Sequence, residues 1–411
     1  MKCNPWTLAL LGAGLVSLPS ITHAEEKPNA VLTALTATTL SGYVDTSAQW
    51  NIGTGNANLP PYAFGGSGKA DGFNLNVVQV KLEKPIDATD AWAAGYKVDL
   101  IFGPDANSLA TQSSGVAADF GIKQAYVALH APVGNGLDFK LGVWDTIMGY
   151  EVFESGNNPN FTRSYGYTME PTTHTGLLMT YQFCDAFSAS VAIVNTFGPK
   201  INERSFAGTN PQSESAKAYM ASFTFTAPTN TGFLGGSTLS ACVMNGFNSG
   251  VVSSPAGSGF GDNVTSWYVG GTLNTPVTGL KVGFAFDDMD VHDSHGETWA
   301  VGGYVAFQAT EKLSFYGRAE YVRDRGDQKF FANRTVDGDF NFATAPDRFM
   351  EMTFTAQYDL WKNVMSRLEL RWDHSLSGEG VWGSGPVDSG STGPGTQKNA
   401  VMLAANIIYK F

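Results

Sequence analysis

Charged residues alternate with apolar residues in a short segment near the carboxyl end of the chain, and this spacing limits the chemistry that they can do. Within residues 363–374, Leu368, Leu370 and Trp372 occupy every second position. The charged residues between and beside them are Arg367, Glu369, Arg371 and Asp373. Strict alternation is typical of a β-strand with one apolar and one polar face. Ionised groups held on one face act on nearby solutes through their electric field, which requires no covalent step.

Two further segments, residues 312–324 and 347–360, carry charged residues in the same way. Arg318 and Glu320 share a face of the first, and Glu351 lies on the polar face of the second. If these segments cross a membrane as strands, the charged faces must point to water, because an arginine facing hydrocarbon at the midplane costs about 2–4 kcal/mol. We therefore predict a pore lined by Arg318, Glu320, Glu351, Arg367, Glu369, Arg371 and Asp373. The alternative interpretation is a ladder of ion pairs that only stiffens the wall.

The elements that position these residues are predicted to be strands along the whole chain. Sixteen segments combine apolar or alternating patterning with bounding turn residues. They lie near residues 39–51, 72–83, 91–102, 121–131, 136–145, 173–183, 186–198, 216–227, 235–247, 264–275, 279–289, 297–308, 312–324, 347–360, 363–374 and 399–411.

The connections between these segments alternate between long and short. The long ones lie near residues 52–71, 103–120, 146–172, 199–215, 248–263, 290–296, 325–346 and 375–398. Transmembrane barrels have an even number of strands, short turns at the periplasmic end and long loops at the outer end. A soluble β-sandwich has no reason to separate its loops by length in this way. The pattern predicts an all-β, antiparallel, up-and-down transmembrane β-barrel of about sixteen strands.

Both ends of the chain carry features of a protein exported to a bacterial outer membrane. Lys2 precedes a short apolar run, and the residues that end at Ala24 offer a small-residue cleavage site, as in a secretory signal. At the other end, apolar residues alternate up to Phe411, a pattern that the barrel-assembly machinery of outer membranes reads. The predicted divisions are a signal peptide at 1–24, a short periplasmic lead-in at 25–38 and the barrel at 39–411.

The acidic composition argues against a nucleic-acid partner. Loss of residues 1–24 removes one of the 25 basic residues and none of the 37 acidic residues, so the net charge changes from −12 to −13. A nucleic-acid-binding protein would need a basic face. Beyond the amino-terminal leader, the sequence has no apolar run long enough for a membrane-spanning helix, which takes about 20 residues.

Three stretches resemble a known family of outer-membrane proteins. They run from Ala93 to Ala106, from Gly134 to Glu151 and from Asn158 to Leu178. They are similar to the OmpL-like β-barrel porin-2 family, and the similarity extends over the whole predicted mature chain. The resemblance implies the barrel fold and the outer-membrane location, and it brings no catalytic residue with it.

The third long loop, residues 146–172, is a second candidate site. In sixteen-stranded general porins the third loop folds inward and narrows the pore, and this chain is similar in loop number and length. The candidate constriction residues are Tyr150, Glu151, Glu154, Arg163 and Glu170. The strands that hold this loop lie half a ring from the segments at 312–324 and 347–360. An inward loop is therefore expected to direct its acids at Arg318, Arg367 and Arg371, whereas the basic wall of general porins lies on early strands.

One further motif is interpreted as a solvated loop in preference to a divalent-cation site, because its spacing matches no known ligand register. Its residues are Asp287, Asp288, Asp290, His292, Asp293, His295 and Glu297. Neither a metal nor a cofactor is expected. A membrane-embedded hydrolase is the weakest alternative, because a hydrolase needs a base and a nucleophile placed together by the fold.

These observations predict a passive diffusion channel for small hydrophilic solutes and ions. Weak cation preference is expected, since acids outnumber arginines on the charged wall and in the long loops. The expected partners are outer-membrane lipid, the assembly machinery acting through Phe411, the solutes themselves and further copies of the chain in a homotrimer. A structural or adhesive barrel that acts through its outer loops is the alternative from another class.

Overall fold

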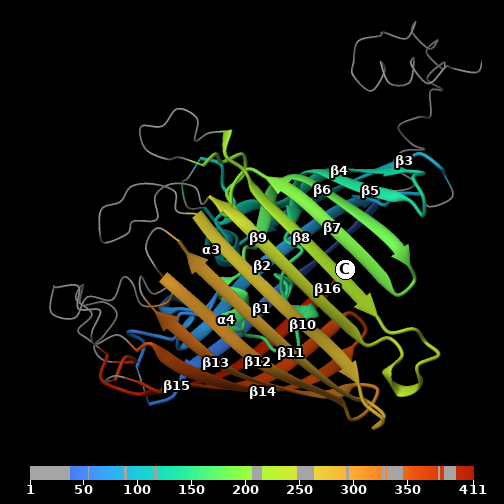
Figure 1. The fold of residues 1–411 in the computed structure, drawn as a ribbon. Helices are drawn as coiled ribbons and strands as arrows, with labels where there is room; N and C mark the ends of the chain where they lie inside the picture. The colour runs from blue at the N-terminus through green and yellow to red at the C-terminus, as the bar shows by residue number, and fades with distance from the viewer. Residues whose placement is uncertain are drawn as a thin grey trace, which may run out of the picture. The chain divides into compact units, whose positions relative to one another are not determined.

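The computed structural model describes residues 38–53, 55–87, 90–114, 116, 118–205, 215–247, 263–292, 296–325, 330, 346–377, 380–383 and 395–411. Within Leu40–Phe411, sixteen antiparallel strands form one closed barrel in which each strand pairs with its neighbours along the chain (Figure 1). The predicted fold class is confirmed. The predicted signal peptide and nearly all of the lead-in lie outside the described residues.

The strand bounds follow the sequence pattern closely. The strands are β1 (Thr39–Asn51), β2 (Gly72–Lys84), β3 (Ala93–Phe102), β4 (Phe120–Ala131), β5 (Leu137–Asp145), β6 (Thr173–Cys184), β7 (Phe187–Val194), β8 (Ala218–Thr226), β9 (Thr238–Phe247), β10 (Asn263–Asn274), β11 (Leu280–Val291), β12 (Gly296–Gln308), β13 (Leu313–Arg325), β14 (Arg348–Trp361), β15 (Val364–Ser375) and β16 (Asn399–Lys410). The short helices are η1 (Ser67–Lys69), α3 (Pro104–Leu109), η2 (Ser155–Asn157), α4 (Tyr165–Met169) and η4 (Gly232–Leu234).

β7 ends at Val194, whereas the sequence predicts a strand up to residue 198. Past Val194 the chain leaves the strand: the Phe197 amide donates to the Phe247 carbonyl at 3.0 Å, and the Phe197 side chain joins the buried apolar cluster inside the barrel. Burial of that ring therefore overrides the alternation that predicts a longer strand.

The barrel closes where β1 meets β16. Beyond the end of β16, the Gly42 and Phe411 backbones exchange two hydrogen bonds of 2.9 and 3.0 Å. A Cβ added to Gly42 would lie 2.6 Å from the Phe411 ring and 2.1 Å from the Gln79 carbonyl oxygen. Only glycine fits this close approach. Closure leaves no unpaired strand edge, which a membrane could not satisfy.

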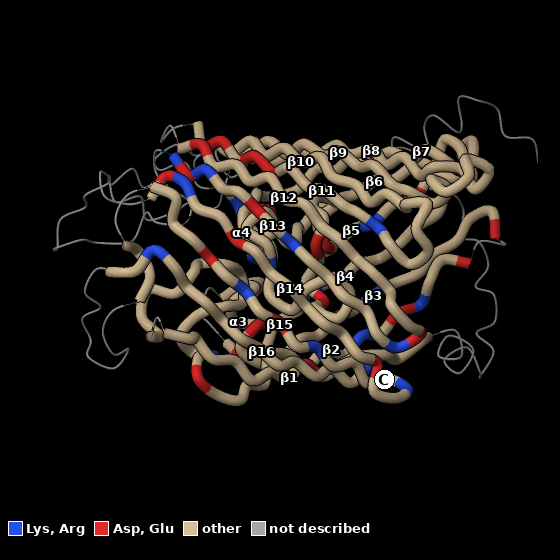
Figure 2. The backbone as a smooth tube through the Cα atoms, turned by 90° about the horizontal axis from the view of Figure 1, so that it is seen from below, with Lys and Arg blue, Asp and Glu red and all other residues tan. Residues whose placement is uncertain are grey.

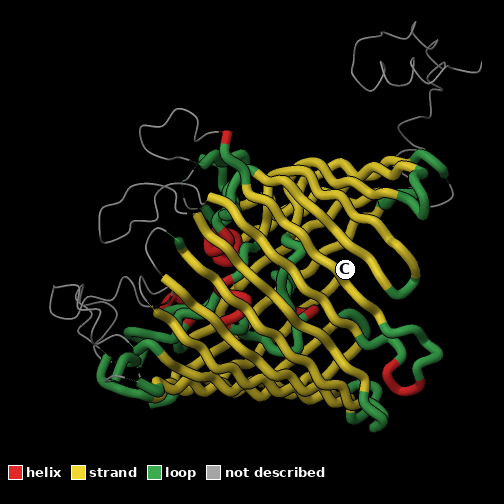
Figure 3. Tube along the Cα trace, in the orientation of Figure 1, coloured by secondary structure: helices red, strands yellow, loops and turns green. Residues whose placement is uncertain are grey.

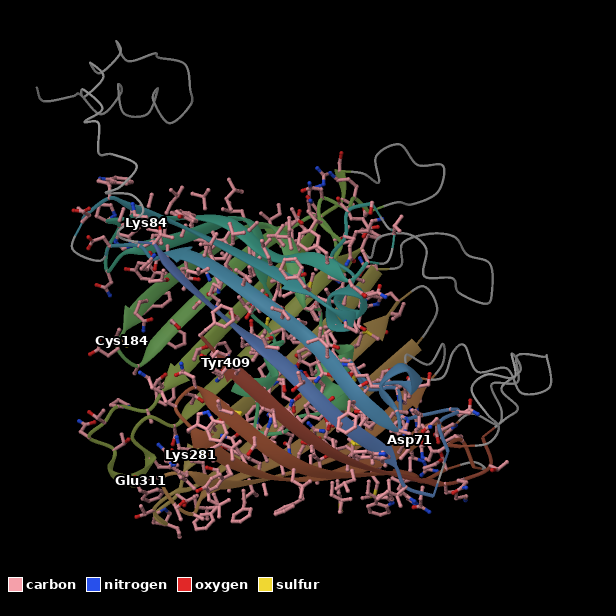
Figure 4. The ribbon with its side chains drawn as sticks, turned by 180° about the vertical axis from the view of Figure 1, so that it is seen from behind. Asp71, Lys84, Cys184, Lys281, Glu311 and Tyr409 are labelled. Atoms are coloured by element: carbon pink, nitrogen blue, oxygen red, sulfur yellow. The ribbon has the colours of Figure 1, made fainter. Side chains whose placement is uncertain are left out.

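The strands separate apolar residues from charged ones across the barrel wall. On β15, Leu368 and Leu370 are 55% and 47% exposed on the outer face, whereas Arg367 and Arg371 are buried on the inner face. Figure 4 shows side chains covering the outside of the barrel, with Asp71 at the end that carries the long connections and Lys281 at the end with short turns. The outer surface is thus the apolar band of a membrane barrel. No helix in the described parts of the chain is long and apolar enough to cross a bilayer.

Candidate functional site

The third loop, residues 146–172, lies inside the barrel. It connects β5 to β6 and contains η2 and α4, and Figure 3 shows helical and loop segments within the cage of strands. α4 begins after Ser164, whose side chain accepts a hydrogen bond from the Tyr167 amide at 2.9 Å and so caps the helix. Tyr165 and Met169 of α4 join a buried apolar cluster that includes inward residues of β8–β11.

Arg318 joins the third loop to the wall formed by β13–β15. Its guanidinium donates to Glu151 at 2.8 Å and to the Thr162 carbonyl at 2.7 Å, both in the loop. It also donates to Glu351 on β14 at 2.6 Å. The side chains of this ion pair are fully buried. Removing one partner of such a pair leaves an uncompensated charge and typically costs about 3–5 kcal/mol.

Two wall carboxylates accept hydrogen bonds from the backbone of the loop. Glu369 accepts from the Phe161 and Thr162 amides at 2.5 and 2.9 Å. Glu320 accepts from the Tyr165 and Gly166 amides, at 2.7 and 3.1 Å, at the start of α4. A carboxylate suits the position of Glu320, because free amides at a helix start favour negative charge.

Two further arginines on β15 complete the attachment. Arg367 donates to the Ser155 carbonyl at 2.9 Å. Arg371 donates to the Arg163 carbonyl at 2.7 Å and forms an ion pair of 2.9 Å with Asp373. The alternating charges along β13–β15 appear as blue and red segments in Figure 2.

All seven residues predicted to line a pore therefore lie together on the inner face of one wall. Each of them is at most 4% exposed. They form hydrogen bonds and ion pairs with the third loop and with one another, and the loop separates them from solvent. Whether they act on solutes directly stays a prediction, but their contacts show that they fix the position of the loop.

The acids of the third loop go to three different places. Glu151 meets Arg318, as expected for an inward loop. Glu154 instead lies 3.0 Å from Lys123 on β4 and 3.0 Å from Gln79 on β2. Burial acts to raise the pKa of Glu154, but the Lys123 ammonium and these hydrogen bonds outweigh it and lower the pKa to about 2. The loop is thereby attached to two separate parts of the barrel wall.

Glu170 contacts neither of these cations. Burial, and then the neighbouring Asp287 carboxyl on β11, raise the pKa of Glu170 well above its ordinary value. Gly149 and Gly166 make room for the pair, since an added Cβ would lie 2.0 Å from Glu170 Oε2 and 2.4 Å from Asp287 Oδ2 respectively. One proton shared between the two carboxyls would hold this part of the loop to β11.

The remaining loop residues pack inside the barrel. The Tyr150 ring stacks on Tyr304, with ring centroids 4.1 Å apart, and its hydroxyl lies 3.1 Å from Thr272 Oγ1. The buried Arg163 donates to the Phe161 carbonyl at 2.9 Å and lies over the Tyr167 ring. Arg163 thus stabilises the fold of the loop itself.

The wall formed by β6–β9 differs from the charged wall. Its inward side chains near the short-turn end are hydroxyls that are only partly buried. Thr180 bonds to Ser190 at 2.8 Å, and Thr224 bonds to Ser240 at 3.1 Å. Small neutral groups of this kind leave room beside them, and they hydrogen-bond to water and polar solutes.

Sequence reasoning did not single out two lysines on early strands. Lys97 on β3 and Lys140 on β5 point inward and are partly buried. The Lys140 ammonium lies 5.0 Å from the centroid of the Tyr126 ring, and the Lys97 ammonium lies 3.7 Å from Asp99. The alternation in residues 91–102 already places Lys97 opposite the apolar face, so that pattern could have found it. This inner surface, unlike the arginine wall, carries basic groups that are partly open.

The acidic segment around residue 290 does not form one cluster. Asp287 points inward and is 4% exposed, whereas Asp288 and Asp290 lie on the outer face of β11 by alternation. Asp293 and His295 lie outside the described residues. Within the part of the chain that the structure describes, no group of three or more His, Cys, Asp or Glu residues could hold a metal ion.

A closed sixteen-stranded barrel with an inward third loop defines a protein with the fold of an outer-membrane porin. The family model described as "Putative beta-barrel porin-2, OmpL-like" matches residues 37–411, and the chain belongs to this family. The protein is therefore an outer-membrane β-barrel with a porin-like channel fold.

Several solved structures share the fold of this barrel. The outer-membrane channel DcaP of Acinetobacter baumannii shares 13% identity at a TM-score of 0.56, over 91% of this chain and 97% of that one. The anion-selective porin from Comamonas acidovorans shares 12% identity at a TM-score of 0.57, over 91% of this chain and 99% of that one. OmpT of Vibrio cholerae in its trimer form shares 12% identity at a TM-score of 0.53, over 91% of this chain and 99% of that one. No match was found among curated protein sequences.

Proposed function

We propose that this protein is a passive diffusion channel for small hydrophilic solutes and ions, weakly selective for cations, and that it is not an enzyme. The observation that carries the proposal is the unequal filling of the barrel. The third loop packs against the arginine wall of β13–β15, while the inner faces of β3–β9 keep partly exposed polar side chains towards the short-turn end. A diffusion path needs such a polar surface beside a fixed constriction.

The path runs between the exposed edge of the third loop and the opposite wall. On the loop, Val152 is 43% exposed and Asn157 is also exposed. The opposite surface combines the hydroxyl groups of β6–β9 with Lys97 and Lys140. In this arrangement Arg318, Arg367 and Arg371 set the position of the loop and thereby the width of the path.

The preference for cations follows from which charges are neutralised. Arg318 and Arg371 form ion pairs with buried carboxylates, and Arg367 is hydrogen-bonded to Ser155 and Asn406 behind the loop, so the three arginines add little positive potential to the path. The whole chain carries a net charge of −12, and a low-dielectric barrel focuses the resulting field on the opening. Lys97 and Lys140 oppose this field locally, which keeps the expected preference weak.

A structural or adhesive barrel with a closed interior is the second candidate function. It is favoured by the packing at the long-loop end, where Tyr62 of the first long loop lies over Arg371 with 3.9 Å between the guanidinium carbon and the ring centroid. Ala63 also donates its amide to Thr168 of the third loop at 2.9 Å. A barrel whose interior is closed by this packing would act through its outer loops.

Planar-bilayer recording of the purified, refolded protein distinguishes the two functions. The channel proposal expects stepwise conductance and, across a tenfold KCl gradient, a reversal potential of the sign that cation preference gives. The preference should weaken in high salt, because the screening length falls from about 10 Å at 0.1 M to about 3 Å at 1 M. Absence of conductance would favour the structural barrel, and an anion-selective pore would contradict the charge argument.

The proposed partners follow from the same fold. OmpT of Vibrio cholerae, with a similar fold, has been solved as a trimer, and we extend that assembly to this chain as a homotrimer surrounded by outer-membrane lipid. We also keep the barrel-assembly machinery as a partner, with Phe411 as its point of contact. Cross-linking of the protein in its native membrane tests the assembly: a ladder that ends at three copies is expected.

A further inference from the structure

Three arginines gather on the lipid-facing side of the barrel, at the long-loop ends of β13 and β14. They are Arg323 and Arg325 on β13 and Arg348 on β14. Along the same strands, Val322, Asp324 and Phe349 are fully buried on the inner face. Because side chains alternate along a strand, the three arginines point outward. We name this group the arginine rim.

Within the described part of the chain, the repulsion between the two rim arginines that face each other is not relieved by an ion pair to Arg323. Arg323 and Arg348 are directly opposite each other in the β13–β14 ladder, and like charges at such positions are destabilising. Arg323 Nε is buried without a hydrogen-bond partner. Among the described residues, Arg348 bonds to the half-exposed Asp347 at 3.3 Å, and neither Arg323 nor Arg325 forms an ion pair. An anion lying over the rim would relieve this repulsion.

The residues below the rim indicate where that anion comes from. One position nearer the middle of the outer face, Tyr321 packs against Trp299 with ring centroids 5.4 Å apart. Outward aromatic rings of this kind form the belts that mark the headgroup level on membrane barrels. The groups that meet the rim are therefore lipid headgroups, and the anions that headgroups carry are phosphates.

We propose that the arginine rim binds the phosphate group of a lipid of the outer leaflet. Guanidinium groups suit this ligand, because their planar fork donates two parallel hydrogen bonds to phosphate oxygens. Adjacent strands lie about 4.8 Å apart, so Arg323 and Arg348 reach the same headgroup. Arg325, two positions along β13, reaches the next phosphate or sugar oxygen outward.

Acidic residues on the neighbouring strands confine the headgroup to β13 and β14. Asp288 and Asp290 lie on the outer face of β11, and Glu297 on β12 is opposite Asp290 in the ladder. These carboxylates repel a phosphate from β11–β12. Glu297 is also opposite Arg325 in the ladder and partly offsets its charge, so Arg323 and Arg348 are the two arginines that carry the binding of phosphate.

Lipid binding by the purified full-length protein in neutral detergent tests the proposal. The probe is diphosphoryl lipid A, with fully dephosphorylated lipid A and inorganic phosphate as the two comparison ligands. We expect the wild type to bind the diphosphoryl form in preference to both. The double variant R323Q/R348Q should bind roughly 30-fold more weakly, since each basic residue near a lipid surface contributes about 1 kcal/mol.

Two control variants separate specific recognition from loss of charge. K312Q/K362Q removes two exposed lysines at the opposite, short-turn end of the barrel and should bind lipid like the wild type. R323K/R348K keeps the charge but loses the fork, and should bind with intermediate strength. Both Gln variants should keep the heat resistance of the folded barrel, because these side chains are on its surface.

Three results would overturn the proposal. The first is equal lipid binding by the wild type and R323Q/R348Q. The second is equal loss of binding in R323Q/R348Q and K312Q/K362Q, which would show a response to overall charge. The third is a change in the number of assembled copies in R323Q/R348Q with unchanged lipid binding, which would make the rim an interface between copies. None of these results depends on whether the barrel conducts.

Discussion

The two inner walls of the barrel use polar residues for opposite purposes. On β13–β15 the polar residues are long and charged, such as Arg318 and Glu369, and they are buried against the third loop. On β6–β9 they are short and neutral, such as Ser190 and Thr224, and they are partly exposed. The long charged side chains extend from the wall and bind the backbone of the loop that packs against it. The short hydroxyls bond to hydroxyls on the neighbouring strands and leave space beside them inside the barrel.

This difference shows that charge on the inner face of a barrel is not by itself evidence of a conduction path. A charged wall whose ionised side chains are all held in ion pairs or hydrogen bonds is a structural surface. The path is better sought where polar side chains remain partly open. Each prediction below perturbs one of the two walls, or the loop between them, and the expected effects are given from the largest to the smallest.

The largest effect is expected from Arg318→Met. Glu151 and Glu351 would be left buried without their cation, which costs about 3–5 kcal/mol. The folded barrel should lose its heat resistance at a clearly lower temperature, as followed by the shift of the folded band on a denaturing gel. Arg204→Met is the matched control, since among the described residues the exposed Arg204 bonds only to nearby backbone carbonyls. Equal heat resistance of the two variants would contradict the attachment role of Arg318.

The second perturbation, R367Q/R371Q, distinguishes a wall that holds the loop from a wall that selects ions. Both arginines donate to loop carbonyls, so the variant should be destabilised by about 2–5 kcal/mol. Its reversal potential should change little compared with its stability. A stable variant with clearly stronger cation preference would show instead that these arginines face the conduction path, and the comparison of the two walls would then be wrong.

The third prediction concerns pH and the attachment of the loop to Lys123. The pKa of Glu154 falls from its ordinary value of 4.5 to about 2. Because the folded-state pKa is lowered, Glu154 stabilises the protein above pH 4.5 and loses this contribution as pH falls towards about 2. Heat resistance of the wild type should therefore exceed that of Glu154→Gln at neutral pH, and the difference should vanish near pH 2. A difference that is constant between pH 2 and pH 7 would contradict this ion pair.

The smallest effect is expected from K97Q/K140Q. These lysines are partly open and hold no part of the third loop in the described contacts, so their loss should leave heat resistance nearly unchanged. Cation preference should increase by a small shift of the reversal potential, which is larger in 0.1 M than in 1 M KCl because of screening. K81Q, which changes an inward lysine on β2, offers a single-charge comparison. An unchanged reversal potential would place the path away from this wall.

The sequence predicted the strands far better than the contacts of the site. Alternation along β15 was sufficient to place Arg367 and Arg371 on the inner face, because side-chain direction in a strand is a local property. Their burial could not be read in the same way. The partner of Glu369 is the Phe161 amide, 208 positions earlier in the chain, and such a contact exists only after the barrel closes and the loop folds inward.

The third loop illustrates the same limit in its acids. Its position between β5 and β6 was predictable from loop lengths, since those depend on where strands begin and end. Glu154 pairs with Lys123 and not with an arginine on β15, and this pairing depends on how the loop crosses the interior. Loop composition does not encode that path, because Glu151 and Glu154 are chemically alike and three positions apart.

Accessibility of single cysteines to a charged thiol reagent during bilayer recording tests the central claim most directly. In a Cys184→Ser, Cys242→Ala background, Ser222→Cys places a thiol on the β6–β9 wall, and Thr355→Cys places one on the wall behind the third loop. The account predicts that the reagent reduces the conductance of the Ser222→Cys pore and leaves the Thr355→Cys pore unchanged. Block of the Thr355→Cys pore, with none at Ser222→Cys, would contradict it.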